Sequence, residues 1–263
     1  NPAGAPSGLT EMDYKTLADS WKPLRRGPFK ITNAITGEEY AYQLIYEGQK
    51  EPVKILVDAP LAPGAKVMAT LEEGLPAPVV KKTYGRYVPE RKDDFAWEND
   101  RVAFRMYGRA LEATPKEMAY GVDFWNKRTG NLVIDKWYKR TNYHKDDGDG
   151  LDYYHVGLML GAGGIAPYVG DSIWHSRNYT AQRIIDSGAL RTTFELGYEP
   201  WNVNGKQVNV TKTVSIDAHA QLSKMVIRYT DELPVAIGIS KRKEAGTILL
   251  EEGKGVMGYW EPQ

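Results

Sequence analysis

Cysteine is absent from the 263 residues of this chain, and histidine is scarce, with four copies. Without cysteine the chain forms no disulfide bonds and performs no thiol chemistry, so any metal site must use histidine and oxygen ligands. The histidines do not have the spacing of a helical zinc motif, and there is no G-x-S-x-G nucleophile motif. Thiol enzymes are therefore excluded, whereas a metal site assembled in three dimensions stays open.

The chain also lacks a net charge and a long apolar run. Its 34 Lys and Arg residues balance 34 Asp and Glu residues, and the longest basic run is the KRK of residues 241–243. A balanced chain does not produce the positive field with which proteins bind nucleic acid. No window approaches the roughly 18 consecutive apolar residues of a membrane-spanning helix. We therefore expect neither a nucleic-acid partner nor a membrane span.

Helical patterns are nearly absent, and short alternating strand patterns follow one another along the chain. Segments such as ALRTTFELGY and VNVTKTVSID are typical strands, and Asn204 with Gly205 marks a hairpin. Only residues 180–188 have the pattern of a helix, and GVDFWNKRTGNLVIDKWY predicts two strands around a turn at Gly130. We predict an all-β protein, a large antiparallel β-sandwich of supersandwich type with very little helix.

The domain organisation follows from the same patterns. The first residues, NPAGAPSG, lack both an initiating Met and a strand pattern, so residues 1–8 are expected to form a flexible tail. There is no repeat and no linker in the rest of the sequence. Residues 9–263 are therefore predicted to form a single β-sandwich catalytic domain.

Charge is concentrated in residues 88–108, VPERKDDFAWENDRVAFRMYG, beside four aromatic side chains. If residues 97–107 form one strand, their side chains alternate between two faces. The apolar face carries Val102, Phe104 and Met106, and the other face carries Trp97, Asn99, Arg101, Arg105 and Tyr107. Two arginines on one face require anions nearby, which are either acidic side chains of an internal ion-pair network or the carboxylate of a ligand.

A second dense region, YHKDDGDGLDYYHVG, covers residues 143–157. Asp147, Asp149 and Asp152 alternate with glycines and suggest a calcium site, although the spacing is not that of an EF-hand. His144 precedes this acidic turn, where a neighbouring carboxylate could hold one ring nitrogen and leave the other free as a base. A solvated surface histidine is the competing interpretation, and the other three histidines suggest no chemistry.

Aromatic residues with polar tips are numerous, with 17 Tyr and seven Trp. Such residues fill sandwich cores, and at sheet edges they also provide flat surfaces for sugar rings. Several lie near the charged segments, namely Trp97, Trp125, Trp137, Tyr107 and Tyr138. The combination favours a groove for an acidic sugar over a groove for lipid.

Four motifs between residues 86 and 217 carry a family resemblance: VPERKDDFAWENDRVAFRMYG, GVDFWNKRTGNLVIDKWY, YHKDDGDGLDYYHVGLMLGAGG and GALRTTFELGY. They resemble a family of exported bacterial proteins described as a domain of unknown function and associated with polysaccharide degradation. The resemblance implies elimination on uronate-containing oligosaccharides, as in ulvan-oligosaccharide dehydratases, and a periplasmic or secreted protein whose signal peptide has been removed. Arg109 and His155 depart from the family pattern, which has Pro and Lys there.

The resemblance and the chemistry together suggest roles. Elimination at a uronic acid needs a group that neutralises the carboxylate, a base for the C5 proton and an acid for the leaving oxygen. We assign the base to His144, the acid to Tyr107 and the carboxylate clamp to Arg105 or Arg101. Further substrate-binding candidates from the motifs are Arg91, Trp97, Asn99, Trp125, Lys127 and Arg191. No cofactor is required, apart from the calcium that the three aspartates could hold.

Other functions also fit these residues. A glycoside hydrolase would use two carboxylates, for which Asp94, Glu98 and Asp147 are candidates. A sugar mutarotase or epimerase would use His144 without cleaving the substrate, and a carbohydrate-binding module would need only the tryptophans. The choice between a dehydratase and a lyase depends on whether a hydroxyl or a glycosidic oxygen leaves, which the same residues would serve.

Overall fold

The structure, a computed structural model, describes residues 8–59, 61, 65–140, 145–241 and 246–261. These residues are mostly β-strands in antiparallel sheets, with two short α-helices, α1 (Tyr14–Ser20) and α2 (Ile134–Tyr138), and short 3₁₀ turns. The predicted all-β fold with very little helix is confirmed. None of the described helices has the length and apolar character needed to cross a membrane.

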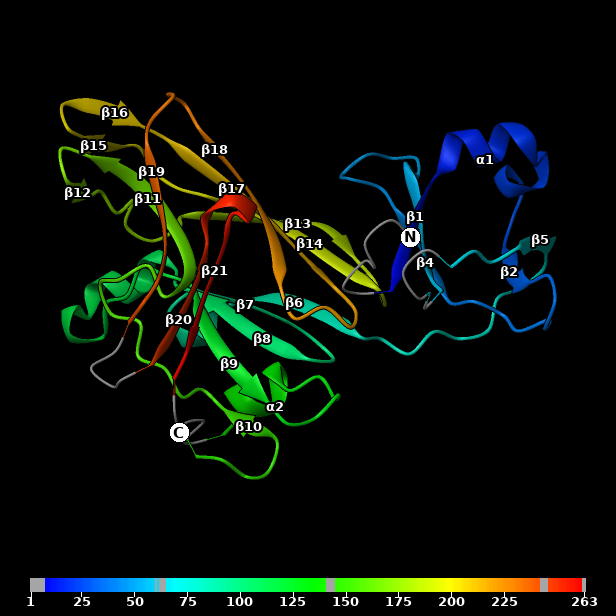
Figure 1. Cartoon of the computed structure of the whole chain (residues 1–263), viewed down its shortest axis with the longest axis horizontal. Helices are drawn as coiled ribbons and strands as arrows, with labels where there is room; N and C mark the ends of the chain where they lie inside the picture. Colours follow the sequence, from blue (N-terminus) through cyan, green and yellow to red (C-terminus); the bar gives the residue numbers. More distant parts are fainter. Residues whose placement is uncertain (1–7, 60, 62–64, 141–144, 242–245, 262–263) are drawn as a thin grey trace.

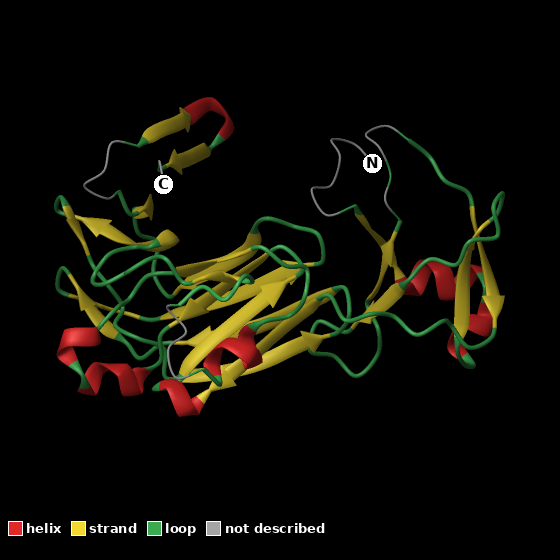
Figure 2. Ribbon diagram, turned by 90° about the horizontal axis from the view of Figure 1, so that it is seen from below, coloured by secondary structure: helices red, strands yellow, loops and turns green. Residues whose placement is uncertain are grey.

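Two layered sheets form the main body of the molecule (Figure 2). The five-stranded sheet has the order β10-β9-β8-β7-β6 and consists of β6 (Thr83–Val88), β7 (Asp94–Asn99), β8 (Val102–Met106), β9 (Asp123–Lys127) and β10 (Gly150–Leu151). The four-stranded sheet has the order β13-β14-β17-β18 and consists of β13 (Ala181–Ser187), β14 (Arg191–Gly197), β17 (Val210–Asp217) and β18 (Ser223–Tyr229). Their inner faces pack on each other, as in a β-sandwich.

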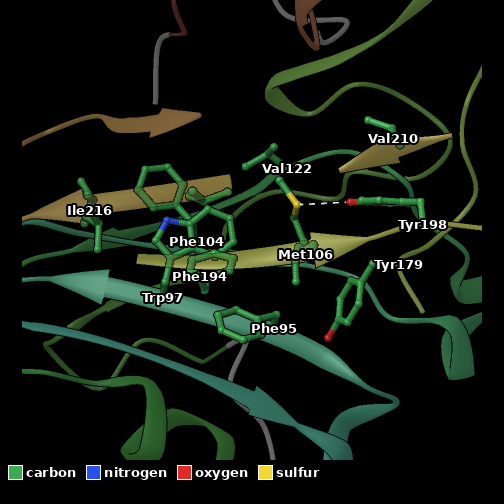
Figure 3. Close-up of a cluster of buried hydrophobic side chains, with 13 residues drawn as sticks. Phe95, Trp97, Phe104, Met106, Val122, Tyr179, Phe194, Tyr198, Val210 and Ile216 are labelled. Atoms are coloured by element: carbon green, nitrogen blue, oxygen red, sulfur yellow. Dashed lines mark hydrogen bonds between the residues drawn. The ribbon is translucent and has the colours of Figure 1, made fainter. Parts of the chain in front are cut away.

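Aromatic side chains fill the space between the two sheets (Figure 3). Register pairs Trp97 with Phe104 across the β7–β8 hairpin, and their rings stack with centroids 5.3 Å apart. Phe194 of the four-stranded sheet stacks on Phe95 at 4.0 Å. The indole nitrogen of Trp97 donates to Ser223 Oγ at 2.9 Å, so its polar tip is satisfied within the core. Burial of these large rings dominates the stability of the sandwich.

A smaller N-terminal lobe lies beside the sandwich (Figure 1). It contains α1 and the strands β1 (Leu9–Asp13), β2 (Phe29–Asn33), β3 (Tyr42–Ile45), β4 (Lys54–Asp58) and β5 (Ala69–Glu73), in sheets β1-β4-β3 and β2-β5. The Asp13 side chain caps α1 by accepting from Thr16 N at 2.7 Å. The lobe has its own apolar core, built around Phe29, Ile31 and Ile55.

Polar side chains fasten this lobe to the sandwich. The buried carboxylate of Asp186 on β13 accepts from the backbone N–H groups of Tyr46 at 2.8 Å and Glu47 at 2.9 Å. Gln43 on β3 accepts from Leu190 N and Arg191 N, both at 2.8 Å. An apolar cluster supports the same junction and consists of Leu9, Ile45, Leu56, Leu190 and Ala218.

The remaining strands form a third sheet and two hairpins. The sheet β12-β11-β19 consists of β11 (Ala162–Val169), β12 (Ser172–Ile173) and β19 (Val235–Ile239). Two hairpins complete the fold, one of β15 (Trp201–Val203) and β16 (Lys206–Val208), the other of β20 (Thr247–Glu251) and β21 (Val256–Trp260). The turn predicted at Asn204 and Gly205 is confirmed between β15 and β16.

Three local predictions are wrong. The helix predicted over residues 180–188 is the strand β13, because this segment pairs with β14 and a register shift after Ile184 interrupts its alternation. The second strand predicted after Gly130 is instead α2, whose first N–H groups are taken up by Glu98. Residues 97–107 are not one strand but the β7–β8 hairpin, so Trp97 shares a face with Phe104 and not with Arg105.

The lobe junction makes a testable prediction. Asp186→Ala leaves the N–H groups of Tyr46 and Glu47 without their acceptor, which costs about 1–3 kcal/mol locally. We expect faster amide hydrogen exchange in β3 and β4 and unchanged exchange in β14 and β17. The control is Asp19→Ala, which removes an exposed carboxylate of the same lobe. Unchanged exchange in β3 and β4 of Asp186→Ala would contradict the role given to this carboxylate.

Candidate active site

The outer face of the five-stranded sheet carries buried charge instead of solvent-facing side chains. Alternation turns Phe95 and Phe104 inward, and it turns Asp94, Glu98 and Arg105 outward. On β9 the outward residues are Asp123, Trp125 and Lys127. The apolar side chains of Val133, Ile134 and Trp137, at and within α2, cover part of this face.

Arg105 is the centre of this outer face, and it is 5% exposed. Its Nε donates to Asp123 Oδ2 at 2.9 Å, and Nη2 also contacts that oxygen. Nη2 donates to Asp152 Oδ2 at 3.2 Å, and Nη1 donates to Asp94 Oδ2 at 3.5 Å. Three carboxyl groups from three different segments therefore meet at one guanidinium, which we name the Arg105 cluster.

Aromatic groups complete the surroundings of the Arg105 cluster. The guanidinium carbon lies 4.9 Å from the ring centroid of Tyr107 and 5.4 Å from that of Trp125. The Trp125 indole donates to Asp123 Oδ2 at 3.2 Å, and the Tyr138 hydroxyl donates to Asp94 Oδ2 at 3.2 Å. Oδ1 of Asp123 is buried and has no hydrogen-bond partner among the described residues.

Burial changes the acidity of these carboxyl groups. It raises the pKa of Asp94 to about 6, although the charges of Arg105 and Arg91 oppose the rise. Burial and the negative charge of Asp123 raise the pKa of Asp152 to about 7. One guanidinium cannot balance three carboxylates, so protonation of Asp94 or Asp152 relieves their repulsion. The cluster can therefore hold and release a proton near neutral pH.

The Arg105 cluster forms the floor of an open pocket of about 400 Å³. Asp94, Arg105, Tyr107 and Asp152 line this floor. The remaining polar lining residues are Arg91, Lys116, Glu117, Tyr153, Tyr154 and His155. A pocket of this size accommodates a small number of sugar units, and its cations could attract an acidic one.

Five of the residues singled out in the sequence meet in this pocket: Arg91, Asp94, Arg105, Tyr107 and Asp152. Burial raises the pKa of Tyr107 well above its usual value, so its hydroxyl stays protonated at neutral pH. Its oxygen lies 3.4 Å from Arg105 Nη2. His144, the predicted base, lies outside the described residues. Arg101 is exposed in the turn between β7 and β8, at the far end of β8 from Tyr107.

Four other predicted substrate-binding residues lie outside the pocket and make contacts that stabilise the fold. Trp97 and Trp125 are 0% exposed, so neither ring presents a surface for a sugar. Asn99 is buried too: its Oδ1 accepts from the N–H groups of residues 101 and 102, and its Nδ2 donates to the carbonyls of residues 217 and 220, at and after the end of β17. Arg191 donates to Asp217 Oδ2 at 2.7 Å and pairs with Glu11 at the lobe junction. These residues hold the turn, the core and the lobe together.

Lys127 forms a second buried ion pair on the outer face. Its Nζ donates to Glu98 Oε2 at 2.7 Å and to the Asn99 carbonyl at 2.6 Å, and both charged side chains are 0% exposed. Glu98 also accepts from the N–H groups of Val133 and Ile134, where α2 begins. The pair fixes α2 on the sheet, and neither residue lines the pocket above Arg105.

The structure does not assemble the proposed calcium ligands. Asp149 lies within 3.3 Å of Arg140, and Asp147 lies within 3.5 Å of the same guanidinium. Asp152 instead turns inward to Arg105. Within the described residues there is no group of three or more His, Asp or Glu side chains placed to hold a metal ion. Asp147 and Asp149 thus pair with Arg140, and Asp152 pairs with Arg105.

Sequence patterns indicate no role for several residues of the Arg105 cluster and its pocket. They indicate Asp94 only as a candidate hydrolase carboxylate, and they indicate no chemistry for Asp123 or His155. Because β8 pairs with β7 and β9, the outward side chains of all three strands lie side by side on the same face of the sheet. Outward acidic residues on β7 and β9 beside an outward arginine on β8 were thus the available signal. No local pattern indicates Lys116, which comes from the loop before β9.

Comparison with known proteins identifies the relatives of this chain. A family model described as "Domain of unknown function (DUF4861)" matches residues 11–263. An uncharacterized protein, P7, of Formosa agariphila is 32% identical over 252 residues, which cover 89% of this chain and 63% of that protein. The chain thus spans about 63% of the length of this relative. No solved structure matches the chain.

The buried pair of Lys127 and Glu98 makes a second prediction. Lys127→Met leaves the Glu98 carboxylate buried without its counter-ion, and we expect a loss of about 3–5 kcal/mol in the free energy of unfolding. Lys136→Met removes an exposed lysine that pairs with Asp149, and it should cost less than about 1 kcal/mol. Urea denaturation measures both. Equal effects of the two substitutions would contradict the structural role of Lys127.

The raised pKa values predict a pH dependence of stability. Asp94 and Asp152 have an ordinary pKa of 3.8 when unfolded and about 6 and about 7 when folded, so the folded state binds extra protons between these values. Their contribution to stability is complete below about pH 4 and is lost as the pH rises through about 6 to 7. Asp152→Asn, a neutral isostere, should therefore reduce the fall in Tm across this range.

The control for this experiment is Asp147→Asn, which makes the same charge change at a half-exposed position of the same loop. It should keep the pH dependence of the unchanged protein. A pH profile of Asp152→Asn that runs parallel to the unchanged protein would show that Asp152 titrates like an exposed carboxylate.

Proposed function

We propose that this chain, which belongs to the DUF4861 family, is a carbohydrate-active enzyme that eliminates water or a glycosidic oxygen from uronic-acid-containing oligosaccharides. The Arg105 pocket is its proposed active site. The observation that carries the proposal is the pair of carboxyl groups, Asp94 and Asp152, whose pKa values are raised to about 6 and about 7 on the floor of a pocket that Arg91 and Lys116 also line. Groups with such pKa values are suited to exchange protons near neutral pH.

Residues on the floor and on the walls of the pocket have different proposed roles. Arg105 is already surrounded by three carboxyl groups, so it holds and orients them instead of clamping the carboxylate of a substrate. Arg91 and Lys116, on the pocket walls, are better placed to neutralise a uronate carboxylate. This neutralisation acidifies the C5 proton of the sugar.

The proposed reaction has one proton donor and one proton acceptor. Ionised Asp152 removes the C5 proton, the C4–O bond breaks, and its electrons leave with the oxygen as the C4=C5 double bond forms. The hydroxyl of the neighbouring Tyr107 supplies a proton to the departing oxygen. Tyr107 fits the donor role because its hydroxyl stays protonated at neutral pH. His155, on the pocket wall, and His144 are the alternative bases.

The proposal also includes a substrate class and a cellular location. Ulvan-type uronates and a periplasmic or secreted location are supported by the sequence motifs that resemble exported polysaccharide-degrading proteins. The proposed reaction uses side chains alone and no resident cofactor.

A glycoside hydrolase is the second candidate, favoured by the presence of two carboxyl groups with raised pKa values on one pocket floor. In that case one carboxyl group protonates the glycosidic oxygen and the other activates water or attacks the sugar. The products separate the two reactions, because hydrolysis adds water and elimination creates an unsaturated uronate.

The test is incubation with a panel of uronate oligosaccharides, followed by ultraviolet absorbance and mass spectrometry. We expect a new unsaturated uronate, with either the loss of one water or two fragments of which one is unsaturated. Asp152→Asn should lower kcat by about 10²–10⁴-fold, and Arg91→Ala should mainly raise KM. Asp147→Asn is the control and should keep full activity.

Saturated fragments with added water would replace elimination by hydrolysis. A change of sugar stereochemistry alone would identify a mutarotase or epimerase. Binding without any chemical change across the panel would identify the protein as a carbohydrate-binding module. Full activity of Asp152→Asn would remove this residue from the mechanism even if elimination were observed.

A further inference from the structure

A second buried cation lies inside the sandwich, away from the Arg105 cluster. Lys212 of β17 is 6% exposed, and its ammonium group has no hydrogen bond or ion pair with any described residue. Its Nζ lies 4.6 Å from the ring centroid of Tyr198, so an aromatic face is its nearest electrostatic contact in the described part of the chain. An ammonium group in such surroundings has lost most of its hydration without gaining a counter-ion.

The other fully buried lysine of the described residues shows the contrast. Lys127 lies 2.7 Å from the carboxylate of Glu98, and so its charge is balanced within the protein. Burial alone lowers the pKa of Lys212 to about 8, with no opposing contribution from a carboxylate. At neutral pH most Lys212 side chains therefore remain charged, and the charge is unbalanced.

A small cavity adjoins Lys212 between the two sheets. Its volume is about 10 Å³, and its polar lining residues are Lys212, His175, Ser176 and Tyr120. The other lining residues are apolar side chains and glycines, and no acidic residue is among them. Burial, and secondarily the charge of Lys212, lowers the pKa of His175. The cavity thus has an excess of positive charge and several hydrogen-bond donors.

Size and charge together restrict what the cavity can hold. A space of this volume holds about one water-sized particle, and so it excludes a sugar or any other large ligand. A water molecule would fill the space but would leave the charge of Lys212 unbalanced. A single small anion would fill the space and balance the charge.

We propose that Lys212 and the cavity beside it form a binding site for one small monovalent inorganic anion, of which chloride is the simplest. His175, which also lines the cavity, can offer a ring N–H as a further donor. The site is separate from the Arg105 pocket and shares no lining residue with it, so its occupation does not depend on the proposed elimination.

The direct test replaces chloride by bromide, which scatters X-rays anomalously. Crystals of the protein grown in bromide should show an anomalous peak within contact distance of Lys212 Nζ. A peak absent from the cavity, with bromide on the protein surface only, would overturn the proposal.

A test in solution uses the stabilisation that a bound anion brings to the folded state. At constant ionic strength, each tenfold rise of chloride above its Kd should raise the Tm by about 3 °C. Lys212→Met removes the charge but keeps the apolar stem, and it should abolish this rise. Lys224→Met is the matched control, because it removes an exposed lysine from the adjacent strand β18 and should keep the rise.

The outcomes are distinct. A chloride-dependent Tm in the unchanged protein and in Lys224→Met, but not in Lys212→Met, supports the site. A Tm that does not respond to chloride, or that responds equally in all three proteins, overturns it. Neither result alters the expectation for the uronate assay, which depends on the Arg105 pocket.

Discussion

The balance of charge around Arg105 is the constraint on which the site and its side of the fold depend. Three carboxyl groups, Asp94, Asp123 and Asp152, share one buried guanidinium. A buried arginine without these partners would be strongly unfavourable, and the carboxyl groups without the arginine would repel one another. Because they come from β7, β9 and the loop after β10, the cluster also fixes where these segments meet. Burial, and secondarily the negative charge of Asp123, raises two pKa values toward neutrality.

The five-stranded sheet separates two kinds of interaction. Its inner face packs aromatic rings on the four-stranded sheet, and this apolar layer provides most of the stability (Figure 3). Its outer face holds the Arg105 cluster and the pair of Lys127 with Glu98, which are costly to bury and depend on complete hydrogen bonding. The stable inner layer thus supports strained electrostatics on the outer face, an arrangement typical of functional sites.

The sequence predicts the fold class and part of the site. Period-two alternation correctly places Phe104 and Met106 inward and Arg105 outward. It fails at Trp97 because a turn intervenes, and Asn99 stabilises that turn through carbonyls more than 100 positions away. The segment around Ile184 resembles a helix locally, but pairing with β14 decides its structure. Asp123 and Asp152 reach Arg105 only through strand pairing and loop folding, which no local pattern contains.

The most direct test of proton binding by the Arg105 cluster is an NMR titration of the aspartate carboxyl carbons. Asp94→Asn and Asp152→Asn assign the signals. Two carboxyl groups should titrate at about 6 and about 7, and each signal should be absent from its own variant. If instead every aspartate titrates near the usual value of about 4, the Arg105 cluster holds no proton at neutral pH. The proposed acid–base role of the pocket would then be contradicted.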